Sequence, residues 1–364
     1  MSEHKDNRSF TIQDTFKAKC IAILLLIFHH MFNDEEEIVQ NCRIRFIECN
    51  TIVKAAVNAR VCVWIFVFLS AYGITISYMR GMTSRTPTAE YRVRFFWHRV
   101  LMLQKIYFPT VIIQYVVLLL TKPSSELILN PLYVVTNFLG IADILNFPKL
   151  TGLYWYISFT LLLILFFPLF YDICERYSYL TIPIVSVLTL GYMGEGIHSH
   201  NGGLYLQYIS AVFAGIIFAQ KNVWYKLKTQ LPSFKSFIRF IVLLMCAIIF
   251  PIIRNSSLQD ILMYKQVLMT GTAIAVCWIA CCYCSLSWLS KLMIFIGKHS
   301  GNMYLLHLLV LYHMKGIIYY SKNIVVSFMS CVIISLLFSV ALSFILKRIG
   351  YYSLIKKIDG KIIP

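Results

Sequence analysis

The strongest constraint in this chain of 364 residues is a series of apolar runs close to the length of a membrane-spanning helix. About 20 helical residues cross the hydrocarbon core of a bilayer. Ten runs bounded by polar residues approach that length: 16–33, 57–79, 101–121, 152–171, 178–194, 204–220, 237–253, 266–287, 301–320 and 324–346. The stretch 127–147 is interrupted by Pro131, Asn137, Asp143 and Asn146, which favours an interfacial or re-entrant segment. The sequence therefore predicts an all-α polytopic membrane protein with about ten transmembrane helices.

The composition excludes an ordinary soluble domain and a disordered chain. Hydrophobic residues make up 59% of the sequence and charged residues 13%, whereas soluble domains carry about 25% charged residues. The longest polar stretch, 34–56, is a loop, so residues 1–364 are expected to form a single membrane-embedded domain without an attached soluble domain. His29, His30 and an acidic loop follow the first run where a signal peptide would have a cleavage site, so that run is interpreted as a retained helix.

The net charge of +17 predicts the orientation in the membrane. With the N-terminus inside and ten spans, the cytoplasmic segments hold 23 basic and 7 acidic residues, and the outer segments hold 10 and 9. The inner face is then +16 and the outer face +1, as the positive-inside rule requires. Both termini are expected to be cytoplasmic, in a multi-pass protein of the cell (cytoplasmic) membrane. The basic residues are divided among short loops, which does not favour nucleic acid binding.

The first run carries ionisable groups at both ends. Lys19 and His30 are 11 residues apart, which is about 1100° of helix, within about 20° of three turns, and about 16 Å along the axis. They therefore share a face, whereas His29 lies about 80° away. Ionisable groups inside a span often mark function. The alternative is a lysine that snorkels to the inner interface and two interfacial histidines.

Two further polar clusters are candidates for a site. In the ninth run, Ser300 and His307 are seven residues apart and share a face with Tyr304; the alternative is a histidine hydrogen-bonded between helices. The cytoplasmic loop 80–105 is basic, and a positive patch beside a membrane cavity suits a phosphate-bearing ligand such as coenzyme A. The alternative for part of this charge is that it only reflects the cytoplasmic position of the loop. No Cys/His spacing indicates a metal site, and no bound cofactor is expected.

Five segments of the chain carry a family resemblance. They are Lys19–His30, Val63–Gly73 with Leu69-Ser70-Ala71-Tyr72, the basic segment from His98-Arg99 through Lys105 to Pro109, Gly152–Ile157 with Trp155-Tyr156, and Gly297–His307. In this order they resemble the acyltransferase-3 family of integral-membrane O-acyltransferases. Three features depart from the family pattern: Lys19 stands in place of the usual Arg, and Ala71 in place of the usual Gly. The basic pair Arg99 and Lys105 before Pro109 is also more widely spaced than the common Arg-x-x-Arg.

The resemblance implies transfer of an acyl group, most often acetyl, from cytoplasmic acetyl-CoA to a hydroxyl of a cell-surface or lipid-linked glycan. His30 would be the general base or a transient acyl carrier, with His29 beside it. Lys19, Arg99 and Lys105, with Arg92 and Arg94, would hold donor phosphates or oxyanion charge. The remaining expected cavity residues are Ser70, Tyr72, Trp155, Ser300, Asn302, Tyr304 and His307. The expected partners are membrane lipids, the acyl-CoA donor and the glycan acceptor; the oligomeric state is not indicated. The alternatives are a transporter or flippase of a lipid-linked glycan precursor and a non-catalytic scaffold.

Overall fold

A computed structural model describes residues 10–43, 47–82, 87–193, 205–230, 236–254, 265–284 and 286–362. Within these ranges the chain forms helices and no strand, as the sequence predicts. Each of the ten apolar runs overlaps a helix, although the bounds differ, most of all for the run 301–320, which covers the end of α15 and all of α16. These helices are α1 (Ile12–Phe32), α4 (Val61–Gly81), α5 (Ala89–Thr121), α8 (Trp155–Tyr177), α9 (Thr181–Met193), α11 (Ile209–Gln220), α13 (Ser236–Arg254), α14 (Lys265–Cys282), α15 (Ser287–His313) and α17 (Ile324–Arg348).

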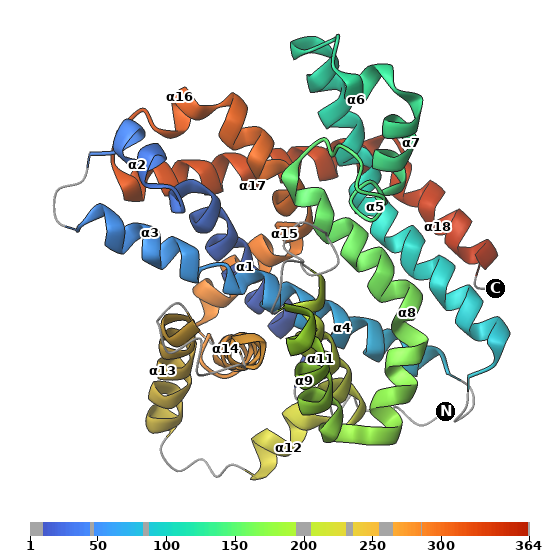
Figure 1. The fold of residues 1–364 in the computed structure, drawn as a ribbon. Coiled ribbons are helices and arrows are strands. Elements are labelled where there is room, and N and C mark those ends of the chain that lie inside the picture. Colours follow the sequence, from blue (N-terminus) through green and yellow to red (C-terminus); the bar gives the residue numbers. More distant parts are fainter. Residues whose placement is uncertain are drawn as a thin grey trace.

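Shorter helices connect or follow these elements (Figure 1). They are α2 (Glu35–Asn41), α3 (Cys49–Asn58), α6 (Glu126–Leu129), α7 (Pro131–Leu139), α12 (Val223–Gln230), α16 (Lys315–Ile318) and α18 (Tyr351–Ile362), with the 3₁₀ turns η1 (Gly152–Tyr154) and η2 (Ser178–Leu180). Ser178, at the start of η2, has a φ of 52°. This left-handed residue turns the chain between α8 and α9, which separates two of the predicted runs.

Five helical segments among the described residues are long and apolar enough to cross a membrane: Ile12–Phe32, Cys49–Gly81, Ala89–Thr121, Gly152–Leu188 and Ile324–Arg348. Three further apolar helices are shorter: Ile209–Gln220, Phe240–Ile249 and Gln266–Cys282. The chain is therefore an all-α membrane protein. The count of ten crossings and the cytoplasmic position of both ends stay predictions.

Helix α1 lies in the middle of the bundle, where it packs against α15 and α4 (Figure 1). Ala18, Ala22 and Ile23 on α1 are fully buried. The crossing with α15 requires glycine, because a Cβ at Gly297 would lie 2.6 Å from the carbonyl carbon of Phe16. Close approach through a small residue is the usual way for helices to pack inside a membrane. It brings the polar residues that follow Gly297 on α15 next to α1.

Three ion pairs within the described ranges connect different helices. Arg92 pairs with Asp172 at 2.8 Å and His98 with Asp359 at 2.6 Å. On the face predicted to be external, Lys315 of α16 pairs with Glu37 of α2 at 2.8 Å. Every ion pair found within the described ranges joins residues expected on one face. Figure 1 shows α2, α3 and α16 together at one end and α18 at the other.

The basic segment 80–105 is not the loop expected from the sequence. Helix α5 begins at Ala89 and continues for 33 residues. Its N-cap is Thr88, whose hydroxyl accepts a hydrogen bond from the Tyr91 amide at 3.2 Å. A side-chain acceptor at this position satisfies a free amide and favours helix initiation. As a result, Arg92, Arg94, Arg99 and Lys105 all project from one helix.

The interrupted stretch 127–147 forms the short helices α6 and α7. Nine residues of α7 extend only about 14 Å, which is less than half of the hydrocarbon core. The buried Asn137 side chain fixes the following turn, since it donates to Pro148 O and accepts from the Leu150 amide. Asp143 is buried between Lys149 and the Tyr205 hydroxyl. Buried polar contacts hold this segment together, and it does not form a continuous spanning helix.

Candidate active site

A cavity of about 600 Å³ lies between α1, α4, α5, α8 and α15, with residues of α17 and α18 at its edge. This volume is within the range of small-molecule sites, about 300–1,000 Å³. Seven of the residues expected from the sequence line it: Lys19, Ser70, Arg99, Lys105, Ser300, Asn302 and Tyr304. Four different helices, α1, α4, α5 and α15, supply them, so residues far apart in the sequence meet at one place.

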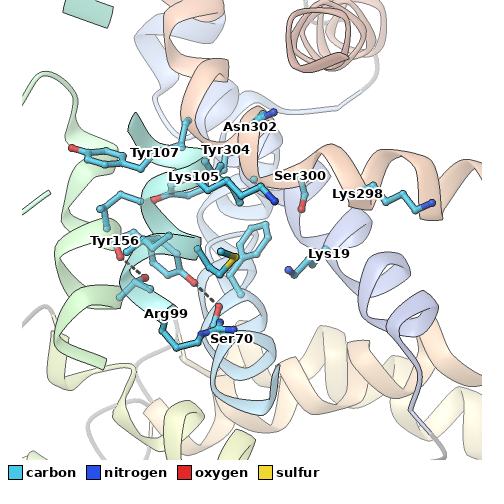
Figure 2. A pocket seen from close by; sticks show the side chains of 18 of the residues that line it. Lys19, Ser70, Arg99, Lys105, Tyr107, Tyr156, Lys298, Ser300, Asn302 and Tyr304 are labelled. Atoms are coloured by element: carbon cyan, nitrogen blue, oxygen red, sulfur yellow. Dashed lines mark hydrogen bonds between the residues drawn. The ribbon is translucent and has the colours of Figure 1, made fainter. Parts of the chain in front are cut away.

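The cavity is strongly cationic. Lys19, Arg99, Lys105 and Lys298 line it, and no acidic residue stands among its described lining residues. Figure 2 shows the charged ends of Lys19, Arg99 and Lys105 directed into the cavity, while Lys298 extends away. The Arg99 Nε is buried and has no hydrogen-bond partner. Because a buried charge without a counterion is costly, this arrangement is suited to an anionic ligand.

Hydrogen bonds hold the polar walls of the cavity in place. The hydroxyls of Ser70 on α4 and Tyr156 on α8 are 3.3 Å apart (Figure 2). The Tyr304 hydroxyl donates to the Leu153 carbonyl at 3.1 Å, which links α15 to η1. Asn302 Nδ2 donates to the Ser343 hydroxyl of α17 at 3.2 Å. These contacts fix the side chains before a ligand binds, which reduces the entropy cost of binding.

The histidines of the two helices lie together. The rings of His30 on α1 and His307 on α15 have centroids 5.2 Å apart, and His29 lies 5.0 Å from His30. His307 Nδ1 lies 2.9 Å from the Tyr304 carbonyl, and His29 Nδ1 lies 2.8 Å from the Ala56 carbonyl. A carbonyl only accepts, so each Nδ1 carries the proton and each Nε2 carries a lone pair when the ring is neutral.

The His307 Nε2 is buried and has no hydrogen-bond partner. The backbone contacts of its Nδ1 therefore leave a basic nitrogen free in the protein interior. This nitrogen is a second candidate for the base, in addition to His30. A proton acceptor close to a polar cavity is what general-base chemistry requires.

An aromatic wall, formed by Tyr304 and Phe66, borders the cavity, and Tyr304 of this wall also contacts His307. Tyr304 and Phe66 both line the cavity, with ring centroids 6.1 Å apart. The Tyr304 ring is also 6.4 Å from the His307 ring. His29, His30 and His307 are not part of the cavity lining. Tyr304 of this wall thus lies between the cationic cavity and the histidine cluster, which is formed by His29, His30 and His307.

Besides the three histidines, four residues predicted for the site are not among the lining residues of the cavity. Arg92 pairs with Asp172 and Arg94 pairs with Glu90, so both charges are neutralised outside it. Tyr72 packs against Phe10 with ring centroids 5.6 Å apart, because it lies about 200° around α4 from Ser70. Trp155 stacks on Tyr208 with centroids 5.3 Å apart. These four residues are thus outside the lining of this cavity, and their expected roles stay predictions.

The cavity also contains residues that the sequence analysis missed. Tyr156 lines it in place of its neighbour Trp155, and Lys298 adds a fourth cation. The other missed polar residues are Tyr107, Thr160, Ser343 and Tyr352. Tyr156 was detectable because it belongs to the same aromatic segment as Trp155. Ser343 and Tyr352 had no local signal, since only the packing of α17 and α18 brings them to the cavity.

The family of the chain follows from comparison with known proteins. A family model described as an acyltransferase domain, that of the acyltransferase-3 family, matches residues 18–348. The chain therefore belongs to the acyltransferase-3 family. This match includes the four cations of the cavity and all three histidines of the cluster. No curated protein and no solved structure matches the chain.

Proposed function

We propose that this acyltransferase moves an acetyl or related acyl group from cytoplasmic acyl-CoA to a hydroxyl of a cell-surface or lipid-linked glycan. The observation that carries the proposal is the cationic cavity without acidic lining residues, with the His30–His307 pair behind its aromatic wall. The family match supports acyl transfer as the class of reaction. No observation favours a glycan transporter.

The cations are proposed to hold the phosphates of the donor. Lys19 and His30 lie on one helix about 16 Å apart, so Lys19 is too far from the histidines to stabilise an oxyanion there. Phosphates are instead bound by Lys19, Arg99 and Lys105 through charge-assisted hydrogen bonds. The extended arm of coenzyme A then passes Tyr304 and Phe66 and presents the thioester to the histidines.

The chemistry proposed at the histidines is general-base catalysis. A histidine Nε2 takes the proton of the acceptor hydroxyl, and the hydroxyl oxygen attacks the thioester carbonyl carbon. The resulting tetrahedral intermediate collapses, and the bond between carbon and sulfur breaks. The coenzyme A thiolate takes the proton back from the imidazolium. The products are an O-acyl ester and the free thiol of coenzyme A.

Both His30 and His307 are candidates for the base. His307 has the Nε2 that is left free by the backbone contacts of its ring, and His30 faces it. In a second version of the mechanism, His30 carries the acyl group transiently and the glycan hydroxyl attacks the acyl-imidazole. A burst of coenzyme A release without acceptor, equal to the amount of enzyme, supports this version; its absence supports direct transfer.

The proposal is tested with purified protein, labelled acetyl-CoA and surface glycans isolated from cells that lack the protein. We expect coenzyme A release together with transfer of the label to the glycan. The His30→Gln variant is expected to lose both. His313→Gln is the matched control, because His313 is an exposed histidine at the end of α15. Full transfer by His30→Gln would contradict the assignment, and label uptake without coenzyme A release would contradict acyl transfer.

A further inference from the structure

A second cavity, of about 590 Å³, lies at the face predicted to be external. Its walls come from the end of α1, the segment before α3, α3 itself and the start of α17. The residues that matter for its chemistry are Phe28, Arg43, Ile47, Ile52, Lys322 and Ile324. None of them belongs to the cationic cavity or to the histidine cluster described above.

Its charge is positive only. Arg43 and Lys322 are exposed, and the lining residues within the described ranges include no Asp or Glu. Asn323, the N-cap of α17, also lines the cavity. The N-terminus of a helix of 25 residues adds a partial positive charge at that point. These three contributions favour an anion.

The backbone holds the two cations together. The Arg43 amide donates to the Lys322 carbonyl at 2.7 Å. Lys322 has a φ of 54°, in the left-handed region that glycine and asparagine adopt more easily. Strained backbone of this kind persists where the surroundings enforce it and is concentrated at ligand sites. This turn holds the backbone of Lys322 next to that of Arg43.

Most of the other residues that line the cavity are apolar. Ile47 and Val325 are exposed, and Phe28, Ile52 and Ile324 complete the wall. Helices α1 and α17, which contribute to the wall, are both long and apolar enough to cross the membrane. A cationic rim above an exposed apolar wall matches a molecule with an anionic head and a hydrocarbon tail.

We propose that this cavity binds the phosphate headgroup of an outer-leaflet lipid, with Arg43 and Lys322 as phosphate ligands and the lipid chain along the apolar wall. The site adjoins the histidine cluster through α3. Ala55 lines the cavity, and the next residue, Ala56, accepts the hydrogen bond from His29. Lipid binding here does not depend on the proposed acyl transfer.

The experiment measures binding to the purified full chain in a non-ionic detergent. Dioctanoyl phosphatidylglycerol, dioctanoyl phosphatidylcholine and inorganic phosphate are titrated separately, and the shift in unfolding temperature gives the affinity. Lys322→Asn removes the charge with a residue that tolerates the left-handed backbone, so this variant is expected to fold. Lys322→Arg keeps the charge. Lys54→Gln is the matched control, because Lys54 is an exposed basic residue of α3 outside the cavity.

We expect phosphatidylglycerol to stabilise the wild type and to bind at least about tenfold more weakly to the Arg43→Gln, Lys322→Asn double variant. Lys54→Gln and Lys322→Arg are expected to bind as the wild type does. Equal stabilisation by phosphatidylcholine would overturn the role of the anionic head. Equal binding of inorganic phosphate would show a free-anion site only. Unchanged affinity in the double variant would overturn the location.

Discussion

The substitution Arg99→Gln tests the donor cavity most sharply. Arg99 lines the cavity, and its Nε is buried without a partner. If the guanidinium binds a donor phosphate, its removal deletes a charge-assisted hydrogen bond contributing about 1.5–3 kcal/mol. At about 1.4 kcal/mol for each tenfold change, the Kd for acetyl-CoA rises by about 10- to 150-fold. Arg99→Lys keeps the charge but lacks the planar guanidinium, so its Kd for acetyl-CoA should lie between those of the wild type and Arg99→Gln.

The same substitution has an opposite effect on the empty protein. A buried charge without a counterion destabilises the fold, so its removal should leave the unfolding temperature unchanged or raise it. The assay is equilibrium binding of labelled acetyl-CoA to protein in lipid nanodiscs, with thermal unfolding measured in parallel. Arg94→Gln is the control, because Arg94 pairs with Glu90 on the same helix at 2.5 Å, outside the cavity. Binding by Arg99→Gln at the wild-type Kd would refute the reasoning.

Three further substitutions test other parts of the account. Gly297→Ala places a Cβ 2.6 Å from the Phe16 carbonyl carbon, so α1 and α15 must separate. Such overpacking costs about 1–3 kcal/mol of folding free energy, and calorimetry should show a lower unfolding temperature. His307→Asn keeps a donor near the Tyr304 carbonyl and removes Nε2. The rate of acyl transfer should fall by about 10²–10⁴-fold, whereas the thermal stability should stay unchanged. Tyr304→Phe loses the hydrogen bond to the Leu153 carbonyl. Thermal unfolding should show that the free energy of unfolding is about 1 kcal/mol lower. An unchanged stability would contradict this hydrogen bond.

The sequence predicted the helical architecture because apolar length and charge asymmetry are strong signals in membrane proteins. It also placed Lys19 and His30 on one face of α1, since helical periodicity fixes that relation. In the structure Lys19 lines a cavity shared with α15, and His30 meets His307 of α15. The loop expected over 80–105 was wrong because basic residues at a membrane face do not distinguish a loop from a helix end.

The residues within the site were harder to predict. Arg92 and Arg99 are seven residues apart and share a helix face, but only the fold shows that Asp172 of α8 neutralises Arg92. Neither periodicity nor composition indicates which of two neighbouring aromatics points inward, so Trp155 was predicted and Tyr156 is observed. The sidedness of such residues depends on helix rotation, which tertiary packing sets.

The most direct test of the central claim is the transfer of labelled acetyl groups to surface glycans in cells that express the wild type, His30→Gln, His307→Asn or His313→Gln. The membrane level of each protein is measured in parallel. We expect labelled glycan with the wild type and His313→Gln, and loss of the label with the other two variants. Wild-type labelling by His30→Gln and His307→Asn, at normal membrane levels, would contradict a catalytic histidine pair.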